Sequence, residues 1–168
     1  MRADEVVFQI AFSNHRSSIM IITHESPNQP DIVALLDQLD AYCGGLYPAE
    51  SNHLMDIASL MLPGVVFLVA RDDGGRAAGC GAFVERGDYA EVKRMFVDPS
   101  LRGQGAGARL LADIARRASA AGITCLRLET GIYQPEAIGL YERSGFVRCA
   151  PFGEYQPDPL SLFMERAL

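Results

Sequence analysis

Residues 95–108 read MFVDPSLRGQGAGA, and this stretch decides the fold. An apolar segment ends before Pro99, and Gly103, Gly105 and Gly107 follow directly before a helical repeat of apolar residues. Because glycine has no Cβ, such a loop can turn sharply and let a ligand approach the backbone. The first turn of the helix adds unpaired N–H groups and the positive end of the helix dipole, which together bind phosphate. The stretch therefore predicts a strand–loop–helix unit that holds an anionic ligand.

The charge around this loop favours the same kind of ligand. Between residues 92 and 128 the chain has seven basic residues, whereas Asp98 and Asp113 are the acidic ones. The whole chain, in contrast, carries a net charge of −6, which argues against a general nucleic-acid binder. An anionic ligand explains the local excess of positive charge, and a solvated face of the following helix is the alternative.

Length and composition predict one soluble domain. The chain has 168 residues, 49% of them hydrophobic, and its apolar runs are shorter than the ~20 residues that span a bilayer. Asp4 and Glu5 stand where a secretory signal would have basic residues, so we expect a cytoplasmic protein with no membrane partner. The cysteines show no C-x-x-C spacing and no pairing with histidine, so we expect reduced thiols and no metal site.

Outward from the loop, hydrophobic periodicity predicts an α+β domain. The short turns between residues 65 and 97 indicate an antiparallel meander, and the strand–helix–strand unit around the loop indicates a parallel crossover. We expect residues 20–168 to form the domain and residues 1–19 to be an N-terminal extension outside its core. The predicted strands cover residues 19–23, 65–71, 77–85, 89–97, 124–129, 146–149 and 160–165, and the predicted helices cover 31–41, 50–60, 106–121 and 135–144.

A dinucleotide site is one alternative for the glycine loop. Gly103-x-Gly105-x-x-Ala108 matches the dinucleotide fingerprint formally, and Glu129 lies 21 residues past Ala108. In that fingerprint, however, a strand leads almost directly into the first glycine, whereas five residues including Pro99 intervene here. The antiparallel meander before the loop also disfavours a doubly wound sheet. A plain glycine-rich connection without a ligand is the other alternative.

Two motifs resemble those of one acyltransferase family. Arg102-x-x-Gly105-x-Gly107 is similar to the R/Q-x-x-G-x-G/A pyrophosphate loop of the GNAT N-acetyltransferases, and residues 137–146, AIGLYERSGF, resemble the family's A-I-x-L-Y-x-x-x-G-F signature. The resemblance is closest to small bacterial members whose substrates are often unassigned. It implies the GNAT fold: a central mixed, mostly antiparallel sheet of about six to seven strands. Helices cover both faces of this sheet, and the strands flanking the loop splay apart.

The resemblance also implies that acetyl-CoA is the cosubstrate. Backbone groups at the end of the strand before the loop would line its pantetheine arm, and N–H groups of the loop would bind its pyrophosphate. Gln134 stands where the family often has asparagine, and it keeps the amide on a longer side chain. The implied cofactor residues are Met95, Phe96, Val97, Arg102, Gly103, Gln104, Gly105, Ala106, Gly107, Ala108 and Gln134.

Acyl transfer requires hydrogen-bond donors that stabilise the oxyanion and a proton donor for the departing thiolate. Transfer from a thioester to an amine passes through a tetrahedral oxyanion, which the N–H of Phe96 or Val97 on a splayed strand could stabilise. The departing thiolate has a pKa near ~8.5, so a positioned proton donor helps it leave. The resemblance indicates Tyr141 as this general acid, and a buried core tyrosine is the alternative.

The amine must lose a proton before it attacks, so a base is needed near the acceptor. Two residues are candidates for this base, and a third could bind the acceptor. Glu91 resembles the catalytic glutamate of the histone-acetyltransferase branch, and the alternative is a strand carboxylate paired with Lys93 or an arginine. His53 is a second candidate base, in the polar stretch where the family usually builds its acceptor pocket. Glu50 in the same stretch could bind a cationic acceptor, and a solvated carboxylate at a helix start is the alternative.

We therefore predict an acetyl-CoA-dependent enzyme that moves an acetyl group directly to a primary amine of a small molecule. None of the cysteines lies where a covalent acyl-enzyme would need one. A non-catalytic acyl-CoA-binding module, a protein-amine acetyltransferase and an NAD-dependent oxidoreductase are the alternatives. The expected partner is the amine substrate, without nucleic acid, and family members are commonly homodimers.

Overall fold

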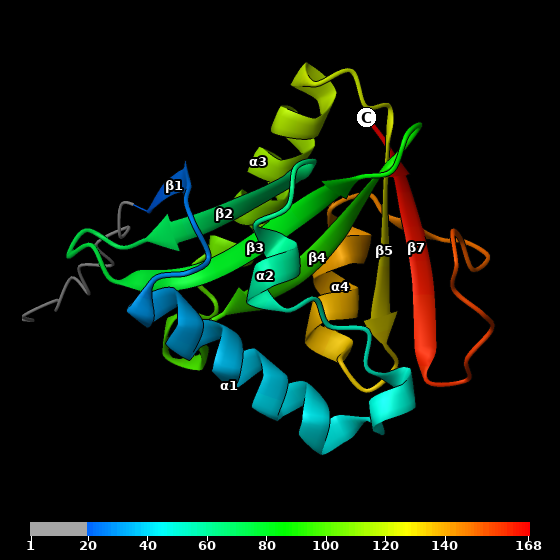
Figure 1. Ribbon diagram of the computed structural model, residues 1–168, viewed down its shortest axis with the longest axis horizontal. Helices are drawn as coiled ribbons and strands as arrows, with labels where there is room; N and C mark the ends of the chain where they lie inside the picture. Colours follow the sequence, from blue (N-terminus) through cyan, green and yellow to red (C-terminus); the bar gives the residue numbers. More distant parts are fainter. Residues whose placement is uncertain (1–19) are drawn as a thin grey trace, which may run out of the picture.

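The computed structural model describes residues 20–168, which form one seven-stranded sheet with helices on both faces (Figure 1). The strands follow the order β1-β2-β3-β4-β5-β7-β6 across the sheet. The predicted extension at residues 1–19 and the predicted strand start at Ile19 lie outside the described residues. The elements are β1 Ile21–His24, α1 Pro30–Leu46, η1 Ala49–Ser51, α2 Ile57–Leu60, β2 Val65–Arg71, β3 Ala77–Glu85, β4 Ala90–Val97, η2 Pro99–Leu101, α3 Ala106–Ala120, β5 Cys125–Gly131, α4 Pro135–Arg143, β6 Val147–Arg148 and β7 Ser161–Ala167.

The pairing of the strands confirms the predicted mixed, mostly antiparallel sheet. β2, β3 and β4 form an antiparallel meander, as their short turns predicted. β4 and β5 run parallel, with α3 as the crossover between them. β5 then pairs antiparallel with β7, which is placed between β5 and β6.

Alternating side chains of the central strands supply two cores, one on each face of the sheet. On β2, Leu68 packs with α3 residues such as Leu110, whereas its neighbour Phe67 packs with α1 residues such as Leu36. This alternation follows from the period of two in a strand. Figure 1 shows α1 and α2 in front of the sheet, and α3 and α4 behind it. The sheet is therefore the central layer of the domain, with an apolar core on each face.

Two predicted helices near the N-terminal side differ from the structure. Helix α1 continues past the predicted end at residue 41 and through Gly44 and Gly45 to Leu46. A Cβ at either glycine would meet nothing within 4 Å, so both lie on the open side of a helix that buried Cys43 anchors. The predicted helix over residues 50–60 is wrong as one element. Only η1 and the single turn of α2 form there, and Asp56 caps α2 by accepting the Ser59 N–H at 2.7 Å.

The sheet opens between β4 and β5. Their pairing stops at the Val92–Leu128 pair, so the β5-facing backbone of residues 93–97 has no partner strand among the described residues. On its other side β4 contains a bulge, where Cys80 faces Phe96 but Ala82 faces Lys93. Figure 1 shows the two strands close together at one end and well separated at their arrowheads, with α4 behind the gap. The predicted splay is thus a property of this sheet.

Candidate active site

A groove runs along the open side of β4 and the glycine loop. Its volume is about 630 Å³, within the range of ~300–1,000 Å³ that small-molecule sites show. We call it the outer groove. It is lined by Leu39, Tyr42, Met95, Phe96, Val97, Arg102, Gly103, Gly105, Ala106, Gly107, Ala108, Gln134, Glu136, Ala137, Leu140, Tyr141, Arg143 and Ser144.

A second, smaller hollow of about 80 Å³ lies deeper, where the strands separate. We call it the inner cavity. It shares Leu39, Met95, Gln134 and Tyr141 with the outer groove, so the two spaces meet at the splay. Its other lining residues are Cys43, Tyr47, Ser51, Asn52, His53, Leu54, Val92, Lys93, Arg94, Glu129, Thr130 and Gly131.

The glycine loop has the geometry of an anion cradle. Gly103 and Gly105 have φ of 78° and 82°, a left-handed conformation that side chains disfavour. A Cβ at either position would meet no atom within 4 Å, so the backbone faces open space. Gly105 is the N-cap of α3, whose 15 residues aim their dipole at the loop. These residues therefore fit a pyrophosphate.

The remaining residues that were predicted for the cofactor divide into two groups. Met95, Phe96 and Val97 line the outer groove together with the loop. Arg102 donates from Nε to the carbonyl of Val97 at 3.2 Å, and its guanidinium lies 5.8 Å from the centre of the Phe96 ring. Gln104, by contrast, is exposed and does not line the groove. Its side chain can be replaced without touching the cradle.

Gln134 is the last residue before α4, and it lines both the outer groove and the inner cavity. Its Oε1 accepts from the Thr130 hydroxyl at 3.1 Å and from the Gly131 N–H at 3.3 Å. Its Nε2 lies 3.8 Å from the Cys43 sulfur on α1. The amide thus ties α1, β5 and the start of α4 together at the junction of the groove and the cavity.

Tyr141 is buried on α4 at the same junction, and its ring packs edge-on against Phe146 at 5.8 Å. Burial raises the pKa of the hydroxyl above its ordinary value, and the nearby Glu129 carboxylate raises it further. The hydroxyl is therefore protonated at neutral pH and can donate a hydrogen bond into the space where the groove meets the cavity.

Glu91 lies outside both spaces. It is buried in β4, where its carboxylate pairs with Lys93 at 2.9 Å and with Arg86 at 3.6 Å. The carboxylate also accepts a hydrogen bond from the Tyr155 hydroxyl. This is the environment of a strand carboxylate paired with a lysine and an arginine, the alternative that the sequence left open.

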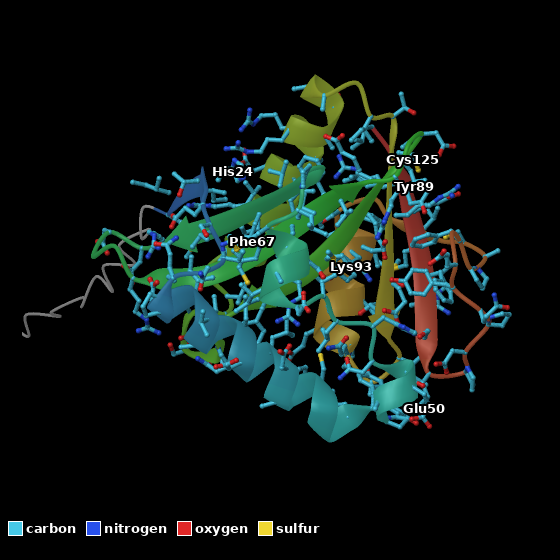
Figure 2. The ribbon with its side chains drawn as sticks, in the orientation of Figure 1. His24, Glu50, Phe67, Tyr89, Lys93 and Cys125 are labelled. Atoms are coloured by element: carbon cyan, nitrogen blue, oxygen red, sulfur yellow. The ribbon has the colours of Figure 1, made fainter. Side chains whose placement is uncertain are left out.

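The two acceptor residues predicted from the polar stretch lie in different surroundings. His53 lines the inner cavity, and its ring contacts Tyr155 edge-on at 5.1 Å. Glu50 is exposed on η1 and lines neither space. Figure 2 shows Glu50 at the lower edge of the molecule, whereas Lys93 lies at the gap between β4 and β5.

Three charged residues that line the inner cavity were not predicted for it: Glu129, Arg94 and Lys93. Glu129 follows the last β5 residue that pairs with β4, and its carboxylate accepts a hydrogen bond from the Ser161 hydroxyl at 2.7 Å. Burial raises the pKa of this carboxyl above its ordinary value. Its place at the carboxyl end of a parallel strand is where ligands bind in α/β sheets, and this signal could have revealed it. Arg94, the second residue, gave no such signal because only the bulge turns it inward.

The described residues 20–168 contain no cluster of side chains that could bind a metal ion. Within residues 20–168, no group of three or more histidine, cysteine, aspartate or glutamate side chains comes together to hold a metal ion. The four cysteines are free thiols. No helix in the same residues is long and apolar enough to cross a membrane.

Comparison with known proteins identifies the family. Residues 32–146 match the profile of the acetyltransferase (GNAT) family. The chain is 54% identical over 149 residues to the IAA acetyltransferase of Azospirillum brasilense, covering 88% of this chain and 97% of that protein.

Solved structures agree. A protein of Klebsiella pneumoniae, described as a candidate acyl-CoA N-acyltransferase, is 39% identical with a TM-score of 0.77, covering 89% of this chain and 98% of that one. The PaiA N-acetyltransferase of Thermoplasma acidophilum, solved with coenzyme A, shares the fold at 16% identity and a TM-score of 0.68, covering 89% and 99% of the two chains. The chain therefore belongs to the acetyltransferase (GNAT) family and is an acyl-CoA-dependent acyltransferase.

Proposed function

We propose that this protein transfers the acetyl group of acetyl-CoA directly to the primary amine of a small molecule. The observation that carries the proposal is the junction at the splay, where the outer groove and the inner cavity share Met95, Gln134 and Tyr141. A donor in the groove and an acceptor in the cavity would meet there, with no need for a covalent acyl-enzyme. Holding two reactants in contact removes much of the entropic barrier to their reaction.

The groove suits acetyl-CoA in size and in charge. The left-handed glycines present N–H groups and the helix dipole to a pyrophosphate, and the β5-facing backbone of β4 is open beside the groove. Acetyl-CoA supplies an activated acetyl thioester whose thiolate can leave. Backbone N–H groups of residues 93–97 that face β5 are not paired with that strand, so they are suited to stabilise the oxyanion that forms during transfer.

Glu129 is the residue that we assign to receive the proton of the acceptor amine. Its carboxyl has a raised pKa because it is buried, so it is a stronger base than an exposed carboxylate. The Ser161 hydroxyl holds one oxygen, which orients the group in the cavity wall. Glu91 lacks this access, because Lys93 and Tyr155 enclose its carboxylate.

Tyr141 is the residue that we assign to protonate the departing thiolate. The charge of Glu129 is one of the causes that raise the pKa of Tyr141. When Glu129 takes the proton of the amine, that charge disappears and the tyrosine becomes the stronger acid. Proton uptake on the acceptor side thereby promotes proton release on the donor side.

The size of the inner cavity favours a small acceptor. A hollow of about 80 Å³ lined by residues of α1, β4 and β5 has room for a small amine. The Azospirillum relative, whose name assigns it an IAA acetyltransferase activity, supports a small-molecule acceptor as well. A module that only binds acyl-CoA would have no use for a buried carboxylate in the inner cavity.

Thiol release from acetyl-CoA across a panel of primary amines tests the proposal. We expect turnover with at least one amine and a kcat that falls as pH drops through the raised pKa of Glu129, because the base must be deprotonated. Glu129→Gln should lower kcat by roughly 10²–10⁴-fold near neutral pH, with partial recovery at high pH where more amine is already neutral.

Glu91→Gln is the matched control, because it removes the same charge from a neighbouring strand outside the cavity. Its pH–rate profile should match that of the parent protein. Coenzyme A binding without thiol release from any amine would refute catalysis. A loss of activity in Glu91→Gln combined with an unaffected Glu129→Gln would return the role of base to Glu91.

A further inference from the structure

The geometry points to an acceptor that carries a carboxylate next to its amine, as a free amino acid does, with Arg94 as the residue that binds the carboxylate. This inference rests on the proposed function and specifies its acceptor. It arises from a buried arginine in the wall of the inner cavity that the transfer chemistry does not use.

The backbone of β4 turns Arg94 into the cavity. Opposite Gly81, the bulge places two residues, Arg94 and Met95, in the space of one. Arg94 has a φ of 57°, and among residues 20–168 it is the only non-glycine residue with a positive φ. A left-handed arginine costs free energy and persists where the surrounding structure demands it. Such positions concentrate at ligand sites.

The guanidinium is buried but only partly satisfied. The side chain of Arg94 is 2% exposed. Its one ion pair within the described residues joins Nη1 to Asp40 on α1, and the Asp40 side chain is 50% exposed. The buried Nε of Arg94 has no hydrogen-bond partner in that part of the chain. An unpaired buried donor is costly, whereas a carboxylate can accept two parallel hydrogen bonds from a guanidinium. The Nε and its neighbouring nitrogen are thus suited to an acceptor carboxylate.

The other charges of the cavity favour a zwitterion. Lys93 is already engaged, because it pairs with Glu91 at 2.9 Å and donates to the His53 carbonyl at 3.3 Å. Arg94 thus remains the cation with an open donor, and Glu129 is the carboxyl that can take a proton from the amine. One cation and one base in a cavity of about 80 Å³ match an amine and a carboxylate that are only a few bonds apart.

A dead-end titration tests this without turnover. The full chain, saturated with coenzyme A instead of acetyl-CoA, is titrated calorimetrically with pairs that differ only in the carboxylate: L-alanine and ethylamine, L-leucine and isopentylamine, and L-phenylalanine and phenethylamine. A charge-assisted bond to a buried partner predicts roughly 10- to 100-fold tighter binding of the amino acid in at least one pair. Arg94→Met should abolish this difference while coenzyme A affinity is retained.

Two further variants make the result decisive. Asp40→Asn keeps Arg94 but removes its counter-ion from an exposed position, so it should tighten the amino acid several-fold and leave the amine unchanged. Arg86→Met, at an exposed arginine outside both spaces, should keep the parent preference. If Arg94→Met does not fold, the Asp40→Asn result decides.

The inference is overturned if amines bind as tightly as their amino acids, if neither class binds, or if Asp40→Asn weakens the amino acid, which is the result of a purely structural ion pair. The proposed function fails separately, through absent coenzyme A binding or absent thiol release.

Discussion

Gly105 and Gly122 form a natural pair for separating ligand binding from backbone strain. Both have a left-handed φ, 82° and 84°, and a Cβ at either position would meet nothing within 4 Å. Gly105 starts α3 in the outer groove, whereas Gly122 follows the end of α3 away from it. Replacement of either by alanine therefore adds the same backbone penalty without a steric clash in the protein.

The magnitudes follow from this geometry. A left-handed alanine costs about 1–2 kcal/mol, so each variant should lose that much free energy of unfolding. For a domain of this size, the loss corresponds to a Tm lower by about 2–8 °C. Only Gly105→Ala places a methyl group where the pyrophosphate approaches the loop. Displacing one charge-assisted hydrogen bond there should weaken coenzyme A roughly 10- to 100-fold, and Gly105→Val should weaken it further.

Thermal unfolding and calorimetric titration with coenzyme A measure the two effects separately. We expect matched decreases in Tm for Gly105→Ala and Gly122→Ala, and a loss of affinity in Gly105→Ala alone. Equal coenzyme A affinities in the two variants would refute the assignment of the loop as the pyrophosphate cradle. A stable Gly105→Ala protein with unchanged Tm would refute the strain argument.

Three other substitutions test the site and its support. Tyr141→Phe should lower kcat by roughly 10²–10⁴-fold in a thiol-release assay with little change in the KM for acetyl-CoA, and full kcat would exclude the general acid. Arg71 holds the pKa of Glu25 at about 2 instead of 4.5, so stability present above pH 4.5 should be lost as pH falls through 2; Glu25→Gln should flatten that part of an acid-unfolding curve, and an unchanged slope would contradict the ion pair. Gly131→Ala would make its Cβ overlap the Cζ and the hydroxyl oxygen of Tyr47, and overpacking of this kind should reduce the free energy of unfolding by roughly 1–3 kcal/mol in urea titrations.

The meander shows how far local patterns reach. β2 and β3 have the bounds that apolar runs and tight turns predicted, Val65–Arg71 and Ala77–Glu85. The crossover through α3 followed from the length of the unit and the glycine loop. These elements are determined by residues that are close together in the chain, so the sequence alone predicts them.

The region between residues 44 and 60 shows where local patterns fail. Two consecutive glycines favour the end of a helix, yet α1 continues to Leu46 because Cys43 and Tyr47 are buried against the rest of the fold. The apolar residues at 54–61 suggested one helix, but only Ile57–Leu60 is helical there, and Asn52, His53 and Leu54 line the inner cavity. Tertiary contacts outweigh propensity in both cases.

The two glutamates considered for the role of base show the same limit. Glu91 and Glu129 are both strand glutamates near basic residues, and their local sequence does not show which carboxylate is enclosed by ion pairs and which lines the cavity. Their surroundings differ because Tyr155 and Lys93 come from distant positions to enclose Glu91. Glu129 instead lies just past the last pair between β4 and β5.

The sequence by itself determined the α+β class, the glycine loop at the start of α3, and the α4 motif that contains Tyr141, because each depends on residues close together in the chain. Only the tertiary structure decided that Glu129 and Arg94 line the inner cavity while Glu91 and Glu50 do not. The reason is physical: the point where pairing between β4 and β5 ends, and the bulge that turns Arg94 inward, are set by register between strands that are far apart in sequence.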